Sequence, residues 1–114
     1  MADADGELGR VKAALRSIQG ALQVYTNWPK SFDALPCVLL TQAGESPADF
    51  RDDAEYLTEI EWYVRVFGSQ ETPHRAICKA VQETMTALGY QRTFRWDEGA
   101  ADVRQTVFRF ITTI

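Results

Sequence analysis

The sequence predicts an α+β protein, in which an antiparallel sheet of about four strands carries two helices on one face, in the order α-β-β-α-β-β. Three observations support this fold class. The stretch EYLTEIEWYVRVFGSQETP, residues 55–73, alternates polar and apolar residues as a long two-faced strand does. Two other segments repeat apolar residues every three or four positions, which is the helical period. Two strand-like segments at the end of the chain are separated by a turn rich in Asp and Gly.

The length and composition of the chain indicate one soluble domain. A chain of 114 residues, 46% of them hydrophobic and 25% charged, can build a single core, so we expect one domain over residues 1–114. No apolar run approaches the ~20 residues that a membrane helix needs. The net charge of −4 argues against a protein that coats nucleic acid, because neutralising phosphates takes clustered Lys and Arg.

The amino terminus and the cysteines indicate an intracellular start. The segment MADADGELGR is acidic and lacks the basic and apolar regions of a secretion signal, so we expect the protein to begin in the cytoplasm. Cys37 and Cys78 lack the spacing of a metal site, and in that compartment we expect both to be reduced and partly buried.

The first helix is predicted from residue 6 to about residue 25. The segment NWPKSFDALP, with two prolines, then ends it. The helical stripe is too short to favour a coiled coil over packing on a sheet. It consists of Leu8, Val11, Leu15, Ile18 and Leu22.

The first hairpin is predicted to join a short strand, CVLLTQ at 37–42, to the long strand. The connection AGESPADFRDDA, residues 43–54, reads as a loop because it is rich in Gly, Ser, Pro and Asp. Alternate residues of the long strand face opposite ways, and we expect the more apolar face to be the core. That face carries Tyr56, Thr58, Ile60, Trp62, Val64 and Val66, and the other carries Leu57, Glu59, Glu61, Tyr63, Arg65 and Phe67.

The second helix is predicted to begin near Pro73, with Thr72 as its N-cap, and to end at Gly89. Two strands, YQRTFRW and VRQTVFRFITTI, then form a hairpin around the turn DEGAAD. The predicted helical stripe is Ala76, Ile77, Ala80, Val81, Thr84 and Leu88.

The sequence gives little support to catalysis. With His74 as the one histidine, mechanisms that need two imidazoles are excluded, and we expect His74 to be a solvated residue at a helix start. Cys78 lies four residues later and could share a helix face with His74, but no feature of the sequence predicts a pocket that would stabilise its thiolate. We therefore expect no catalytic residue and no enzyme.

Two acidic groups were candidates for binding a metal ion. Neither has the register of a calcium-binding loop, so solvated loop charge is the favoured interpretation, and we expect no metal and no other cofactor. The groups are Asp49, Asp52, Asp53 and Glu55 in the first loop, and Asp97, Glu98 and Asp102 in the second.

The long strand and the last strand carry large apolar residues on both faces. Two helices on one side of a sheet would leave part of the second face exposed, and such a patch usually marks a contact with another chain. The alternative is that long loops fold over that second face.

The whole chain resembles the phage tail-completion proteins, the small tail terminators of long-tailed phages and phage-derived tail elements. After a leading helix, LPCVLLTQ resembles their proline followed by a short strand. The segment YLTEIEWYVRVFGSQ resembles their long strand, and TALGYQRT the end of their helix. The segment DEGAADVRQTVFRFITTI resembles their acidic turn and final strand. These similarities concern residue types, and the family has no catalytic residues to transfer.

The resemblance implies a structural protein of a virion tail or neck, assembled in the cytoplasm of the bacterial host. Its subunits would form a homo-oligomeric, hexameric ring that caps the tail tube protein and presents a surface to the head–tail connector protein. Recognition of nucleic-acid sequence and binding to a membrane are not expected. The candidate interface residues are Leu57, Glu59, Glu61, Tyr63, Arg65 and Phe67 on the long strand, and Asp49, Asp52 and Asp53 on the acidic loop.

Other interpretations remain open at this stage. The chain could be a different neck or head–tail joining protein. It could be a ferredoxin-like ligand-binding domain in which Trp62, Tyr63 and Trp96 line a pocket. The weakest alternative is a metal-dependent hydrolase that uses Asp52, Asp53 and Glu55.

Overall fold

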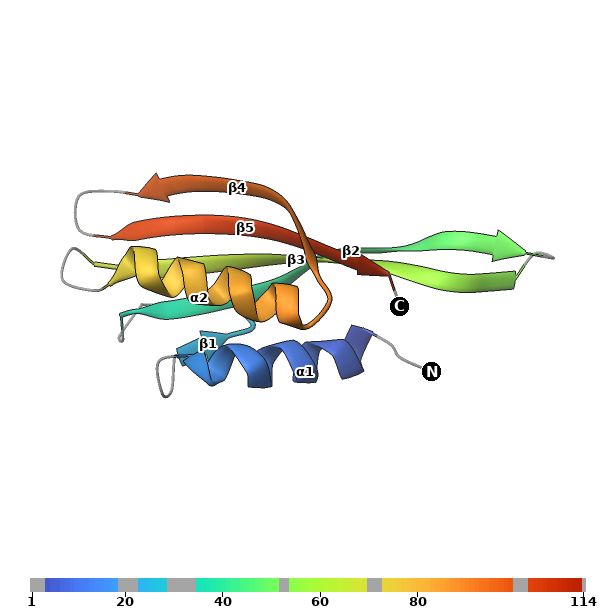
Figure 1. The fold of residues 1–114 in the computed structure, drawn as a ribbon, viewed down its shortest axis with the longest axis horizontal. Helices are drawn as coiled ribbons and strands as arrows, with labels where there is room; N and C mark the ends of the chain where they lie inside the picture. Colours follow the sequence, from blue (N-terminus) through green and yellow to red (C-terminus); the bar gives the residue numbers. More distant parts are fainter. Residues whose placement is uncertain are drawn as a thin grey trace.

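The fold is known from a computed structural model, which describes residues 4–18, 23–28, 35–51, 54–69, 73–99 and 103–113. For residues 4–5, 44–51 and 54–58 the description covers the backbone only. The elements follow the order α-β-β-β-α-β-β (Figure 1). They are α1 (Ala4–Arg16), β1 (Gln23–Tyr25), β2 (Cys37–Arg51), β3 (Ala54–Gly68), α2 (His74–Ala87), β4 (Gln91–Gly99) and β5 (Arg104–Thr113).

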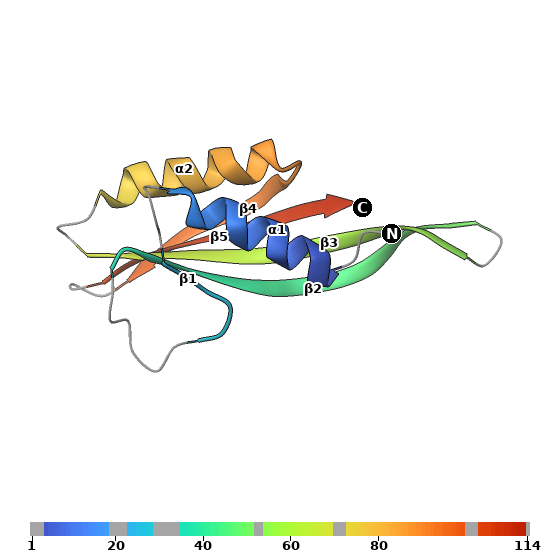
Figure 2. The ribbon, with the colours of Figure 1, turned by 90° about the horizontal axis from the view of Figure 1, so that it is seen from below.

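The five strands form one sheet in the order β1-β2-β3-β5-β4. All neighbours are antiparallel except β1, which runs parallel to β2. The two helices lie over the same face of this sheet (Figures 1 and 2). The predicted α+β class is therefore confirmed, and the sheet gains one short strand, β1, that the sequence pattern did not predict.

The first helix is shorter than predicted. It ends at Arg16, and a turn that includes Ile18 follows it, so Val24 enters the core from a strand and not from a helix. The strand fits its residues, because Val24 is β-branched and Tyr25 aromatic. Leu22, the last residue of the predicted stripe, lies outside the described residues.

The main core fills the space between the helices and the inner face of the sheet. The prediction for the core face of the long strand is confirmed from residue 60 onward, because Ile60, Trp62, Val64 and Val66 are all at most 2% exposed, whereas the side chains of Tyr56 and Thr58 lie outside the description. The other strands and the helices contribute the rest of this cluster: Val11, Leu15 and Ile18 before β1, Val24, Val38 and Leu40 on β1 and β2, Ile77, Cys78, Val81 and Met85 on α2, and Tyr90, Phe108 and Phe110 after it.

The second helix ends as the sequence predicts. Gly89 has a φ of +97°, a conformation that costs glycine little and other residues more. The N–H of Tyr90 donates to the carbonyl of Met85, and the N–H of Gly89 to that of Thr86, which is the Schellman pattern. At the other end the helix begins at His74, directly after Pro73, and Thr72 lies outside the described residues.

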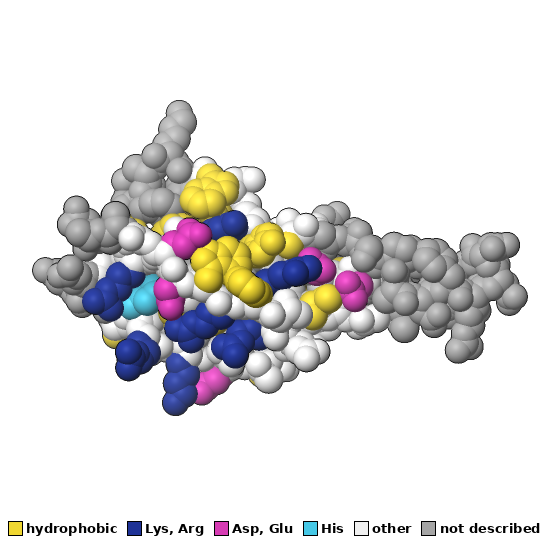
Figure 3. Space-filling view, turned by 90° about the horizontal axis from the view of Figure 1, so that it is seen from above, with side chains coloured by type: hydrophobic (Ala, Val, Ile, Leu, Met, Phe, Trp, Pro, Cys, Tyr) yellow, Lys and Arg dark blue, Asp and Glu magenta, His cyan; other side chains and the backbone are white. Residues whose placement is uncertain are grey.

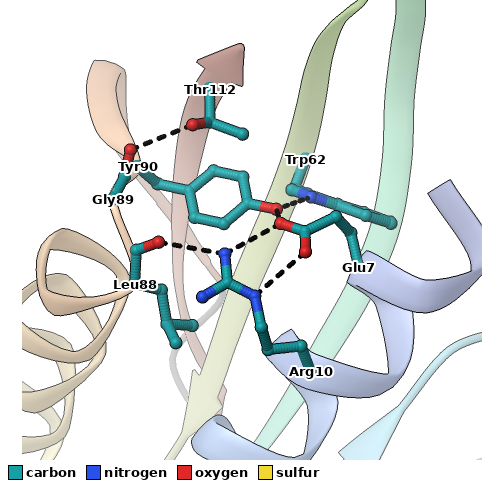
Figure 4. A network of polar contacts seen from close by, with 7 residues as sticks. All are labelled: Glu7, Arg10, Trp62, Leu88, Gly89, Tyr90 and Thr112. Atoms are coloured by element: carbon teal, nitrogen blue, oxygen red, sulfur yellow. Dashed lines mark hydrogen bonds and ion pairs between the residues drawn. The ribbon is translucent and has the colours of Figure 1, made fainter. Parts of the chain in front are cut away.

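A buried polar network ties α1 to the end of α2 and to the sheet (Figure 4). Tyr90 donates to Glu7 at 2.8 Å and accepts from the indole N–H of Trp62 at 2.9 Å. Arg10 donates to both carboxylate oxygens of Glu7 at 2.9 Å and to the carbonyl of Leu88 at 3.0 Å. Glu7 is only 7% exposed, so its charge depends on these partners.

The acidic segment predicted as a loop is mostly strand, so that prediction is wrong. The backbone of β2 continues to Arg51 and pairs with β3 as far as Arg51 opposite Ala54, with register shifts after Gln42, Pro47 and Asp49. Bulges let a strand pass through Gly and Pro without losing its partner. The two strands extend beyond the other elements as a hairpin arm, of which residues 44–51 and 54–58 are described, along the 54 Å length of the molecule (Figure 1).

Candidate assembly surface

The outer face of the sheet, which the helices do not cover, is organised in rows that cross four strands. One row pairs Thr41 on β2 with Tyr63 on β3, Arg109 on β5 and Phe94 on β4. The next row, two residues further along β3, consists of Leu39, Arg65, Val107 and Trp96. Residues in one row point to the same side, because paired positions in antiparallel strands share a face.

A register shift in β4 places its aromatic residues in these rows. Arg92 pairs with Phe110 and Phe94 with Arg109, so Thr93 is an extra residue in the strand. Without this bulge, Phe94 and Trp96 would lie on the inner face with Phe108, since one residue of slip exchanges the faces of a strand. The bulge therefore moves two aromatic side chains to the outer face and brings Arg95 to the helix side.

The aromatic residues and an arginine form what we call the outer-face patch: Trp28, Tyr63, Arg65, Phe94 and Trp96. Trp96 makes edge contacts with Phe94 at 5.0 Å and with Tyr63 at 6.2 Å between ring centroids. The guanidinium of Arg65 lies 5.1 Å from the Tyr63 ring and 5.3 Å from the Trp28 ring. These contacts order the patch before any partner binds.

Two side chains of the patch are well exposed, and the other three are half-buried. Trp28 is 59% and Phe94 is 54% exposed, whereas most large apolar side chains of the described chain are buried. Figure 3 shows hydrophobic side chains gathered at the centre of this face with Lys and Arg beside them. Arg109 and Glu61 form an ion pair of 2.6 Å next to Tyr63, so the patch has a polar edge.

One end of the outer face is covered by the chain itself. Cys37, Leu39 and Phe67 form a second buried cluster, against which Tyr25, Leu35 and Val103 pack. Trp28 contacts Phe67 edge-on at 6.1 Å. The segment around β1 thus covers the outer face at that end, as the alternative interpretation expected for the whole face, and the remainder stays open.

The structure places the predicted interface residues in three groups. Glu59, Glu61, Tyr63 and Arg65 are half-buried residues of the outer-face side of β3, and Phe67 is 3% exposed within the second cluster. Asp49 and Leu57 pair across the arm. Asp52 and Asp53 lie outside the described residues.

Sequence reasoning missed Trp28, Phe94 and Arg109 as surface residues. Phe94 and Trp96 alternate with Arg95 as any two-faced strand does, and the signal that decides their face is the bulge at Thr93. The Tyr–Gln–Arg–Thr stretch before it does not reveal a bulge. Arg109 faces outward because β5 pairs with β3 at Tyr63, which only the strand order determines.

His74 is not the solvated residue that the sequence predicts. Its Nε2 lies 2.8 Å from the hydroxyl of Thr106, which itself donates to Asp97 at 2.5 Å, and burial with nearby arginines lowers the pKa of His74. Cys78 is buried on the same side, and burial raises the pKa of its thiol, so it is not an activated nucleophile. Cys37 and Cys78 are both free, and their burial is more complete than the partial burial predicted, because each is at most 2% exposed.

The geometry contradicts one of the alternative site predictions, whereas Asp52 and Asp53 of the metal-site alternative lie outside the described residues, as does the side chain of Glu55. Trp62 lies on the inner face, 2% exposed, whereas Tyr63 and Trp96 lie on the outer face, so the three do not line one pocket. In the described part of the chain, no three His, Cys, Asp or Glu side chains come together as a metal site would require. Among the described residues no helix is long and apolar enough to cross a membrane.

Comparison with known proteins leaves the family open. No protein-family model matches the chain, and no curated protein matches its sequence significantly. The site must therefore be interpreted from its own geometry.

Proposed function

We propose that this protein is a structural assembly protein of a phage-like tail, a ring-forming terminator that caps the tail tube and offers a docking surface to the head connector. Its place would be the tail or neck of the virion, after assembly in the cytoplasm of the bacterial host. The single observation that carries the proposal is the open outer face with its ordered aromatic patch.

The chemistry of the outer-face patch is that of a protein–protein contact. Aromatic residues and Arg are enriched at the centres of interfaces, where they lose water and contribute most of the affinity. The rings of Tyr63 and Trp96 are already in contact, and Arg65 donates a hydrogen bond to Thr41 at 3.2 Å. These side chains would therefore lose little conformational entropy on binding a partner. Exposure of Trp28 and Phe94 gives a partner apolar area to cover.

The hairpin arm supplies a second surface of different character. A ring that caps a tube needs surfaces for its neighbouring subunits besides the surface that contacts the tube, because its subunit interface is head-to-tail and closes by rotation. The patch is aromatic and lies on the body of the sheet, whereas the arm is acidic and extends beyond it. The resemblance of the whole chain to tail terminators adds the identity of the assembly, which the surface chemistry alone does not specify.

The test is electron microscopy of the purified chain, alone and mixed with the tail tube protein of the same particle. We expect rings, or tubes that acquire a cap and a fixed length. A different neck protein would leave the tubes uncapped but bind the head connector. Binding to neither tube nor connector would contradict the proposal.

A further inference from the structure

The end of the molecule opposite the arm carries a group of basic side chains, which we call the basic cluster. Arg75 and Lys79 come from the first turns of α2, Arg95 from β4 and Arg104 from β5. With His74 and Thr106 between them, Arg75, Arg95 and Arg104 line a cavity of about 270 Å³, and Lys79 lines its neighbour. Figure 3 shows Lys and Arg side chains around the single histidine at this end of the molecule.

Within the described part of the chain, the basic cluster has more positive side chains than acidic partners. There, Arg75, Lys79 and Arg104 have no ion pair or hydrogen bond, and the carboxylate nearest to Arg95 is that of Asp97, at 4.0 Å. Asp97 also accepts from Thr106, so its charge is shared between two partners. Among the described residues, Asp97 and Glu98 line the same cavity and Glu83 lines a neighbouring hollow with Lys79, so four cations face three acids. An acidic partner would find several unsatisfied donors here.

The state of His74 agrees with an excess of positive charge. Because Thr106 donates its proton to Asp97, it accepts from the Nε2–H of His74, which leaves Nδ1 as an unprotonated acceptor. This Nδ1 is buried and has no partner among the described residues. Burial first, then the charges of Arg104 and Arg95, lower the pKa of His74, while Asp97 acts in the opposite direction.

The arm has the opposite charge and lies at the opposite end of the long axis. The sequence of the arm from Gly44 to Thr58 contains five acidic residues and one basic residue, in a chain whose total charge is only −4. The arm extends to one side of the body, whereas the start of α2, the end of β4 and the start of β5 lie at the other (Figure 1). Each subunit therefore has an acidic end and a basic end, separated along its 54 Å length.

We propose that the acidic arm of one copy of this chain docks on the basic cluster of the next copy, so that the arm-to-cluster contact joins neighbouring subunits head to tail. The inference rests on the proposed function, because it names the subunit contact of the ring. Charge complementarity selects the second copy as the occupant, since opposite charges at opposite ends favour this orientation and disfavour arm-to-arm or cluster-to-cluster pairing.

The experiment is a charge exchange between two variants. In the first, Arg75→Glu and Arg104→Glu make the cluster acidic. In the second, Glu45→Lys, Asp49→Lys and Glu55→Lys change the net charge of residues 44–58 from −4 to +2, so that the arm becomes basic. Each variant alone would juxtapose like charges, so we expect at least a tenfold weaker self-association by sedimentation velocity at low salt. Mixed together, the two variants should associate as well as the unmodified chain does.

The matched control is Lys12→Glu with Arg16→Glu on α1, which changes the total charge as much as the cluster variant does but affects no residue that lines the two cavities. It should associate like the unmodified chain. His74 provides an independent signal, because the chain has one imidazole: its pKa, followed by NMR, should rise when an acidic arm binds beside Arg104 and Arg95.

The outcomes separate this contact from the proposed function. If the unmodified chain associates or caps tubes while the cluster variant does so equally well, the contact is wrong and the proposed function stands. If the mixed variants fail to recover association although each is folded by circular dichroism, the contact is also wrong. Failure of the unmodified chain to associate, with or without tube protein, would overturn both. Binding of duplex DNA to the cluster without competition from the arm would assign the cluster to another partner.

Discussion

Trp62 and Tyr63 are adjacent in the sequence and belong to opposite faces of β3. Trp62 is 2% exposed and donates to Tyr90, whereas Tyr63 is half-buried in the outer-face patch. Trp62→Asp should therefore unfold the chain, since it leaves a buried charge and a cavity worth roughly 3–5 kcal/mol. Tyr63→Asp should cost about 1–2 kcal/mol through two lost ring contacts and impair assembly. Urea denaturation followed by circular dichroism compares the two, and the reverse order would mean that the faces are exchanged.

The lowered pKa of Glu7 predicts how the free energy of unfolding changes at acidic pH. The hydrogen bond from Arg10 lowers the pKa of the Glu7 carboxyl below its usual 4.5, against the opposing effect of burial. A carboxyl group whose pKa is lowered in the folded state stabilises the fold at pH values above its usual pKa. This stabilisation is lost as the pH falls towards the pKa of the folded state. Glu7→Gln should thus cost about 1–3 kcal/mol at neutral pH and flatten the loss of stability below pH 4.5. Glu83→Gln, an exposed change on α2, is the control, and equal acid profiles for Glu7→Gln and the unmodified chain would contradict the assignment.

At the scale of elements, the hairpin arm is the part of the sheet that extends beyond the helices and the other strands. The described residues of the two buried clusters lie in the body of the molecule, and Ser46 faces Glu59 in register. Replacing residues 47–58 by Asn-Gly should close a two-residue hairpin and leave the melting temperature within a few degrees of the original. Self-association should be lost. A shortened chain that melts far lower, or that assembles normally, would contradict this separation of body and arm.

The elements also show which parts of the fold can be predicted from sequence. The alternation of Ile60, Trp62, Val64 and Val66 and the glycine at 89 predict the core face and the helix end correctly, because each depends on local periodicity or backbone conformation. The arm was predicted as a loop because Gly44 and Pro47 disfavour strands locally, whereas pairing with β3 outweighs that preference. The outer-face patch depends on the bulge at Thr93 and on strand order, which are tertiary properties.

At the scale of the whole molecule, three surfaces have different chemistry: the aromatic patch on the open sheet face, the acidic arm, and the basic cluster at the opposite end. The proposed ring uses the last two between subunits, which leaves the patch for the tube or the connector. This division predicts that changes in the patch impair capping without preventing ring formation.

The measurement that tests the central claim most directly is the length distribution of tail tubes grown with the unmodified chain, with Phe94→Asp and with Ala13→Asp, viewed by electron microscopy. Phe94 is exposed in the patch, and Ala13 is exposed on α1, over the other face of the sheet, so both variants add one negative charge to the surface. The account predicts short, capped tubes with the unmodified chain and with Ala13→Asp, and long, uncapped tubes with Phe94→Asp. Tubes of equal length under all three conditions, or uncapped tubes with the unmodified chain, would contradict it.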